Sequence, residues 1–312
     1  MSNHKSIFQN LSGKTATLKQ TCSASLLSLV IVCSALPSFT VSARDFSKVE
    51  VKATQANGDV YMLTGSGGNI GVLATKDGLV MIDDQFAPLA NKIEQAMNDV
   101  AEKNNQSAEI KYIINTHYHG DHSGGNSYFS HKAPIIAHKN VRNRLANKKD
   151  AKKETLPVVA YEKGIDIYIG DEKVTLTHLP SGHTDGDTIV YFNQANVLHT
   201  GDLYFQLGFP YVDLNGGGTV KGYLKNMNYM IENTPDDVIV IPGHGVISNK
   251  QEMRDYAAML SYSIKHVEAQ LANGKTEQEI VENGIGEKYK RMSWRFITEK
   301  KWLKTLVKDL AQ

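Results

Sequence analysis

Cysteine is almost absent from this 312-residue chain. There are two, Cys22 and Cys33, and both lie in the first 43 residues, which resemble a removable export segment. Without that segment the protein has no disulfide and no thiolate that could bind a metal, even in an oxidising compartment. Its stability must therefore come from a core. With 41% apolar residues, a chain of this length can form one large α/β domain.

A surplus of positive charge is also lacking. The chain has 34 Lys and Arg against 33 Asp and Glu. Residues 1–43 hold three of the lysines and no acidic residue, so the rest of the chain carries 31 against 33, a formal charge of −2. This balance argues against nucleic acid or an anionic membrane as a partner and favours a small-molecule substrate. The glycines in Thr64–Gly68 are not a dinucleotide fingerprint, because strand patterns flank them on both sides; we interpret them as a flexible hairpin loop.

A long apolar run is missing as well. Residues 26–33 form the longest such stretch near the N-terminus, well short of the roughly 20 residues that span a bilayer. Lysines precede it and Val41-Ser42-Ala43 follows it, as in a secretory signal cleaved after Ala43. We therefore expect a signal peptide at 1–43, a catalytic domain at 44–312 with a C-terminal helical extension, and a periplasmic or secreted protein. An uncleaved anchor is the alternative.

The most informative segment that is present runs from His117 to His122. Its order is His-Tyr-His-Gly-Asp-His, directly after the apolar run Tyr112–Ile114. Imidazole and carboxylate suit zinc, and burying so many ionisable groups without a metal would be costly. His117 and His119 would share one face of a strand and serve a single ion. Asp121 and His122 lie just beyond and are placed for a second ion, which predicts a two-metal hydrolytic site.

Three later segments repeat this arrangement of a strand or turn followed by a residue that can bind metal. His183 lies in the turn Ser181–Gly186, Asp202 follows the apolar run Val197-Leu198, and His244 stands between two glycines after Val238–Ile241. Such loops between rigid strands are where functional side chains collect. The recurrence is more specific than any single motif.

The order His-x-His-x-Asp-His, Gly-His-Thr, Thr-Gly-Asp, Pro-Gly-His-Gly resembles that of the metallo-β-lactamase superfamily, from about Val51 to Ser248. The resemblance implies an αββα four-layer sandwich in the α/β class. It also implies two zinc ions, with iron and manganese as alternatives. The implied ligands are His117, His119 and His183 for one ion, Asp121, His122 and His244 for the other, and Asp202 as a bridge between them.

Two positions depart from the β-lactamases of this superfamily. Asp202 stands where many of them have Cys, which is more like the glyoxalase II and lactonase branches and a group of exported β-lactamase-like hydrolases. Phe205 stands where lactamases with that Cys usually carry a Lys that holds the substrate carboxylate. Lys221 or Lys225 could replace that lysine.

Other residues receive smaller roles. Asp121 is the candidate catalytic carboxylate, and Asn215 lies at about the spacing of an oxyanion-assisting Asn, although a Gly-rich turn also favours Asn there. Asp83 or Asp84 could support a metal-bound His from behind. The remaining histidines of the exported part are expected to be structural or exposed: His131, His138, His178, His199 and His266.

These features favour an exported dinuclear zinc hydrolase, a β-lactamase-type enzyme that would open the amide of β-lactam rings with a metal-bound hydroxide. Asp202 and Phe205 favour the alternative, hydrolysis of lactones, thioesters or other esters. An exported metal-binding protein without catalysis is the third hypothesis.

Overall fold

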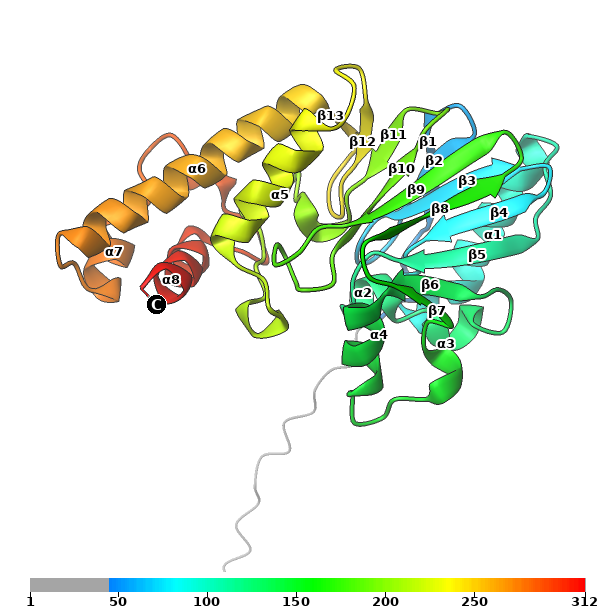
Figure 1. Cartoon of the computed structure of the whole chain (residues 1–312), viewed down its shortest axis with the longest axis horizontal. Coiled ribbons are helices and arrows are strands. Elements are labelled where there is room, and N and C mark those ends of the chain that lie inside the picture. Colours follow the sequence, from blue (N-terminus) through cyan, green and yellow to red (C-terminus); the bar gives the residue numbers. More distant parts are fainter. Residues whose placement is uncertain (1–44, 312) are drawn as a thin grey trace, which may run out of the picture. The chain divides into compact units, whose positions relative to one another are not determined.

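The computed structural model describes residues 45–311, and the predicted signal peptide lies outside them. Two sheets stack face to face with helices on their outer sides (Figure 1). The first sheet has its strands in sequence order: Lys52–Asn57 (β1), Val60–Thr64 (β2), Ile70–Thr75 (β3), Gly78–Ile82 (β4), Ile110–Asn115 (β5), Ile135–His138 (β6) and Val159–Tyr161 (β7). The second sheet has the order β13-β12-β11-β10-β9-β8: Gly164–Ile169 (β8), Glu172–His178 (β9), Thr188–Phe192 (β10), Val197–His199 (β11), Ile239–Ile241 (β12) and Ser248–Asn249 (β13).

The helices are distributed between the two outer faces. Those among the strands of the first sheet are Ala90–Lys103 (α1), Gly120–Ser123 (α2), Asn126–Phe129 (α3) and Lys139–Ala146 (α4). Those later in the chain are Val220–Glu232 (α5), Lys250–Ala272 (α6), Glu277–Asn283 (α7) and Glu299–Leu310 (α8). Short 3-10 turns occur at Ala87–Leu89, Lys153–Thr155, Gly201–Leu203, Leu214–Gly216 and Lys290–Met292.

Alternation along the strands produces the layers. In β4, Val80 and Ile82 point into the core between the sheets, whereas Leu79 and Met81 pack toward α1. Strands buried on both faces appear in sequence as continuous apolar runs. The outer face of the second sheet packs on α5, α6 and α8. The expected αββα sandwich is confirmed, with both sheets mixed: β4, β5, β6 and β7 are parallel to one another, as are β11 and β12.

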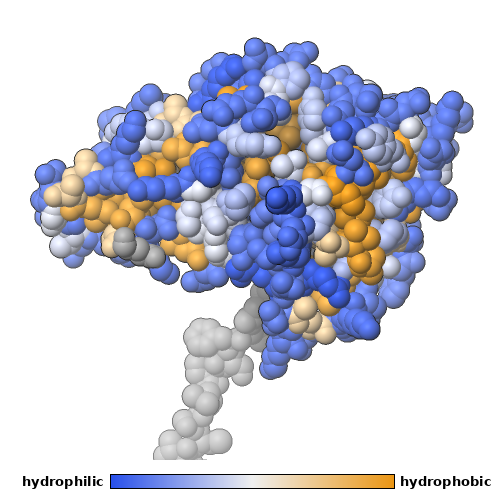
Figure 2. All heavy atoms as spheres, in the orientation of Figure 1, coloured by the Kyte–Doolittle hydropathy of each residue, from blue (hydrophilic) through white to orange (hydrophobic). Residues whose placement is uncertain are grey.

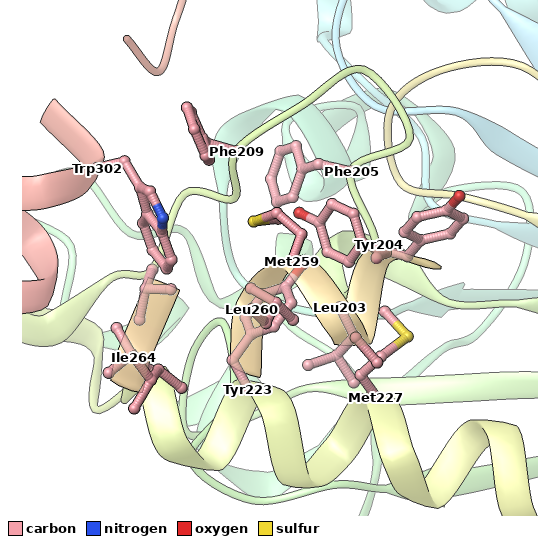
Figure 3. Close-up of a cluster of buried hydrophobic side chains, with 14 of the residues drawn as sticks. Leu203, Tyr204, Phe205, Phe209, Tyr223, Met227, Met259, Leu260, Ile264 and Trp302 are labelled. Atoms are coloured by element: carbon pink, nitrogen blue, oxygen red, sulfur yellow. The ribbon is translucent and has the colours of Figure 1, made fainter. Parts of the chain in front are cut away.

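The helical extension beyond Gly274 packs onto this domain. Thr276 and Glu279 form a capping box at the start of α7, with both reciprocal hydrogen bonds present. Trp302 of α8 is fully buried, and Figure 3 shows it in the same apolar cluster as Phe209 and Ile264. Within residues 45–311, no helix combines the length and the apolar composition needed to cross a bilayer. Figure 2 shows hydrophilic side chains over most of one face, with apolar patches among them over the sheets and the C-terminal helices.

Candidate metal centre

All the predicted metal ligands follow the carboxyl end of a strand. His117 to His122 come after β5, His183 after β9, Asp202 after β11 and His244 after β12. Because β4 and β5 are parallel in one sheet and β11 and β12 in the other, strand ends of both sheets can meet at one edge. Open α/β sheets usually bind ligands at such an edge.

The structure brings the seven residues into two groups. His117, His119, His183 and Asp202 form the first group, and Asp121, His122 and His244 form the second. Within each group, one ligand-type atom from every residue lies within 4.8 Å of those of the others. The resemblance implied the same two sets of three residues, and it placed Asp202 between them.

Asp202 lies between the two groups. Its Oδ2 is 3.6 Å from His117 Nε2 and 3.4 Å from His183 Nε2. Its Oδ1 is 3.0 Å from His122 Nε2 and 3.3 Å from His244 Nε2. One carboxylate thus faces four imidazoles, which is the placement that a bridging ligand needs.

Side chains behind the histidines fix which ring nitrogen faces the centre. His183 Nδ1 lies 2.6 Å from the carbonyl of Tyr211, which can only accept, so this nitrogen donates and Nε2 carries a lone pair. His122 Nδ1 lies 2.7 Å from Asp83 Oδ2, the support that the sequence suggested for one of the two aspartates after β4. Asp84 is also buried, but it accepts from Gly125 N instead. Outer partners of this kind orient metal-binding imidazoles.

Asp213 supports His119 in the same way and was missed by the sequence reasoning. Its Oδ2 lies 3.0 Å from His119 Nε2 and also accepts a very short hydrogen bond from the Tyr118 hydroxyl. Burial alone would raise the pKa of the Asp213 carboxyl, but hydrogen bonds from His119, Tyr118 and Gly216 N hold it below its usual value. It therefore stays ionised. The only signal in the sequence was an Asp two residues before Asn215, in a stretch that we interpreted as a turn.

The inner ring nitrogens face one another, with His183 Nε2 2.8 Å from His119 Nδ1. The outer nitrogen of each ring faces an acceptor, the Tyr211 carbonyl for His183 and Asp213 for His119, so in the neutral rings both inner nitrogens carry lone pairs. His117 Nε2 is buried and has no hydrogen-bond partner. Burial, together with the neighbouring His122, lowers the pKa of His117, and burial lowers that of His183 to about 4. Facing lone pairs and a buried carboxylate require a cation, so the donor set fits a metal centre.

Glycines allow the close approach of backbone to this centre. A Cβ on Gly68 would lie 2.1 Å from His122 Cε1, and one on Gly243 would lie 2.2 Å from Asp202 Oδ1. Gly68 N also donates to the carbonyl of Asp121. The loop Thr64–Gly68 is a hairpin loop between β2 and β3, as its glycines indicated, and it is packed against the ligand residues.

Asp202 is held in place by the apolar cluster between the second sheet and its helices. Leu203, Tyr204 and Phe205 follow it and enter the apolar cluster formed with α5 and α6 (Figure 3). The Tyr223 hydroxyl donates to the Asp202 carbonyl at 2.8 Å. Phe205 stacks on His244 with ring centroids 5.0 Å apart and planes at 4°. The position that often carries Lys in lactamases is thus part of a buried aromatic contact.

The remaining candidates lie outside both groups. Asn215 is exposed in the 3-10 turn Leu214–Gly216, and its oxyanion role stays a prediction. Lys221 pairs with Glu268 on α6 at 2.7 Å, and Lys225 is exposed on α5. His199 is buried and its Nε2 lies 3.2 Å from the carbonyl of Asn69. None of the histidines expected to be structural or exposed joins a group: His131, His138, His178, His199 and His266.

Comparison with known proteins agrees with this geometry. A sequence model described as "Metallo-beta-lactamase superfamily" matches residues 63–244, more than half of the chain. The chain belongs to the metallo-beta-lactamase superfamily. It is thus a metallo-hydrolase of that superfamily, as the motif order predicted.

Individual relatives differ in their named activities. A hydroxyacylglutathione hydrolase of Pelagibacter ubique is 32% identical over 113 residues, 33% of this chain and 40% of the relative. A type 2 metallo-beta-lactamase of a Bacillus species is 27% identical over 183 residues, 57% of this chain and 67% of the relative. The chain thus spans less than half of the length of the hydroxyacylglutathione hydrolase. A metallo-beta-lactamase from Pontibacter korlensis superposes with a TM-score of 0.58 at 18% identity, covering 68% of this chain and 99% of that one, which supports the fold alone.

Proposed function

We propose that this chain is an exported dinuclear zinc hydrolase of activated acyl bonds, with thioesters or lactones as its substrate class. The observation that carries the proposal is Asp202, whose two oxygens face the two ligand groups separately. A carboxylate bridge of this kind, with no cysteine among residues 45–311, is the feature that resembles the thioester and lactone hydrolases. Iron or manganese would suit the same ligands.

The residues supply distinct functions around the metals. His117, His119, His183 and Asp202 would hold one ion, and Asp121, His122 and His244, with Asp202, the other. Zinc bound there supplies Lewis-acid polarisation of the scissile carbonyl and acidifies water to a pKa near 7. Asp121 is the more exposed of the two carboxylates in the groups, and its Oδ2 lies 3.5 Å from His244 Nε2. It is placed to take a proton and deliver it to the leaving group.

Hydrolysis of β-lactams is the second candidate. A named metallo-beta-lactamase is among the relatives, and the predicted export would deliver the protein to the compartment where β-lactams act. Against it, Phe205 fills the position of the carboxylate-binding lysine and stacks on His244. Lys221, one of the lysines that could replace it, is paired with Glu268.

The deciding experiment measures hydrolysis by the purified, zinc-loaded protein on a thioester and a lactone, beside a chromogenic cephalosporin and a carbapenem. We expect turnover of a thioester or lactone that a chelator abolishes and zinc restores. Asp121→Asn should remove it, whereas Asp171→Asn, at an exposed turn between β8 and β9, should not. Faster cephalosporin turnover would establish the second candidate. Full metal content without turnover of any substrate would favour a metal-binding protein without catalysis.

A further inference from the structure

An aromatic surface borders both ligand groups and is not explained by metal binding. We call Tyr211, Trp294 and Phe296 the aromatic wall. The Tyr211 ring centroid lies 5.6 Å from those of both His119 and His183 in the first group. Trp294 lies 6.3 Å from His244 in the second group. Phe296 joins the two, at 5.5 Å from Tyr211 and 5.9 Å from Trp294.

Two members of the wall come from a segment beyond the part of the chain that matches the superfamily. That match ends at residue 244, whereas Trp294 and Phe296 precede α8. Trp294 Nε1 donates to the Phe209 carbonyl at 2.8 Å, and Phe209 N donates to the Met292 carbonyl at 3.0 Å. A Cβ at Gly208 would lie 2.1 Å from that same carbonyl. The C-terminal segment is therefore fastened to the loop that follows Asp202.

Phe296 is exposed and yet held in place. Half of the residue, 51%, is open to solvent. The Lys301 ammonium lies 4.1 Å from its ring centroid and donates to its backbone carbonyl at 3.3 Å. A cation over an aromatic face stabilises the ring in one position. A preorganised apolar surface loses little conformational entropy when a ligand binds to it.

Two further exposed apolar side chains lie close in sequence to Phe205 and His244. Leu207 is 51% exposed and lies two residues after Phe205, and Val246 is 61% exposed and lies two residues after His244. Scattered apolar residues on a surface need no explanation, but the aromatic wall is a connected set of rings beside the ligand groups, which is typical of a ligand site. Small-molecule sites typically combine such walls with a few polar groups that fix the reacting atoms.

We propose that the aromatic wall binds a flat apolar group of the substrate, so that the preferred substrates are acyl compounds carrying an aromatic ring next to the scissile bond. Phe296 and Trp294 are then specificity-determining residues supplied by the C-terminal extension. The proposal rests on the proposed function only in that the bond cleaved is an acyl bond. The ring would lie against Phe296 while the carbonyl reaches the metal centre.

The test compares the phenylacetyl and acetyl thioesters of one thiol, N-acetylcysteamine, on the zinc-loaded protein. We expect a lower KM for the phenylacetyl compound. Phe296→Ala should raise that KM about tenfold, the effect of losing one aromatic contact and its burial, and leave the acetyl compound unchanged. Phe296→Trp should restore the preference. Tyr168→Ala removes an even more exposed aromatic, at 72%, from β8 and serves as the matched control.

A binding measurement separates this proposal from the proposed function. Titration calorimetry of phenylacetate and acetate on the same zinc-loaded proteins needs no turnover. Tighter binding of phenylacetate that Phe296→Ala abolishes would support the wall even if neither thioester is cleaved. Equal affinity for the two acids, or a preference that survives Phe296→Ala, would overturn the wall even if thioesters are hydrolysed. Because Phe296 is half exposed, its truncation should leave the fold intact.

Discussion

The two ligand groups face different surroundings. In the first group, His117 and His183 are buried, and the outer nitrogens of His119 and His183 are held by Asp213 and the Tyr211 carbonyl. In the second, only His122 is fully enclosed. The side chains of Asp121 and His244 are 29% and 15% exposed, and His244 is held by stacking on Phe205.

This difference separates metal retention from substrate access. Hydrogen bonds to fixed partners position His119 and His183 in the first group but only His122 in the second, which favours tighter and more specific coordination in the first group. In the second group the side chains of Asp121 and His244 are partly exposed and Trp294 lies beside His244, so a substrate can reach it. Asp202 faces both ligand groups and is itself buried. Variants can therefore test whether the two sides are as distinct as their surroundings.

The largest effect is expected for Asp202→Asn, which would remove the charge that both sides share. Four histidines would lose their common carboxylate. Loss of a supporting residue typically weakens metal binding or activity tenfold to a hundredfold, so loss of this shared ligand should lower kcat by about a thousandfold or more. Metal analysis and turnover of the substrate found in the panel measure both quantities.

Asp171→Asn is the control for Asp202→Asn, because it removes an exposed carboxylate that belongs to neither ligand group. A variant at 202 that keeps both ions and activity within tenfold of the parent would show that Asp202 is not shared. The two groups would then be independent sites.

The ligand residues could be predicted because each follows an apolar strand pattern or, for His183, lies in the turn between two strands. That pattern is local, and parallel pairing of β4 with β5 and of β11 with β12 brings the strand ends to one edge. The apolar runs likewise predict β5, β11 and β12. Apolar residues at helical spacing predict helices at 88–103 and 251–272, which correspond to α1 and α6 within a few residues.

What sequence could not reveal depends on contacts between distant loops. Asp213 is 94 residues from His119, in a stretch whose composition predicts only a turn. Residues 290–297 have no periodicity, and their place beside His244 depends on Gly208 leaving room for the Met292 carbonyl. Gly68 likewise looks like any hairpin glycine until the His122 ring is placed against it. In each case the signal is a three-dimensional fit rather than a residue pattern.

An intermediate effect is expected for Asp213→Asn, which weakens the support of the first group alone. The neutral amide no longer offers His119 an ionised acceptor, so affinity for one of two ions should fall about tenfold to a hundredfold while the other is retained. Competition with a chromogenic chelator measures the two affinities separately.

Asn215→Ala is the matched variant for Asp213→Asn, two residues away in the same loop. It should leave both affinities unchanged. If Asn215 assists an oxyanion, kcat would fall by about a hundredfold at constant metal content. Equal loss of both ions in Asp213→Asn would mean that the two ligand groups bind metal as one cooperative unit, and that their different surroundings do not make them distinct.

The smallest effect concerns the helix that supports the loop of His183. Asn140 and Arg144 of α4 bind Asp185 in that loop, and His138 caps the helix. His138 Nδ1 accepts from Asn140 N, while Nε2 donates to the Glu162 carbonyl and the ring stacks on His178 at 3.6 Å. Burial, and next the neighbouring His178, lower the pKa of His138 to about 4. Protonation at Nδ1 would remove the cap.

The sign of the pH effect follows from this lowered pKa. The unfolded chain, with a histidine pKa near 6.5, binds more protons than the folded protein between pH 6.5 and 4, so acid lowers the free energy of unfolding. His138→Asn keeps a capping side chain but cannot titrate. The free energy of unfolding, measured in urea, should therefore fall less for His138→Asn than for the parent between pH 6.5 and 4.5. Reduced for solvent screening of the imidazolium charge, the difference between the two falls should be about 1 kcal/mol. Metal loss at low pH affects both proteins and cancels in the difference. Identical pH profiles would remove His138 from the support of the first group and leave Arg144 and Asn140 as its anchors.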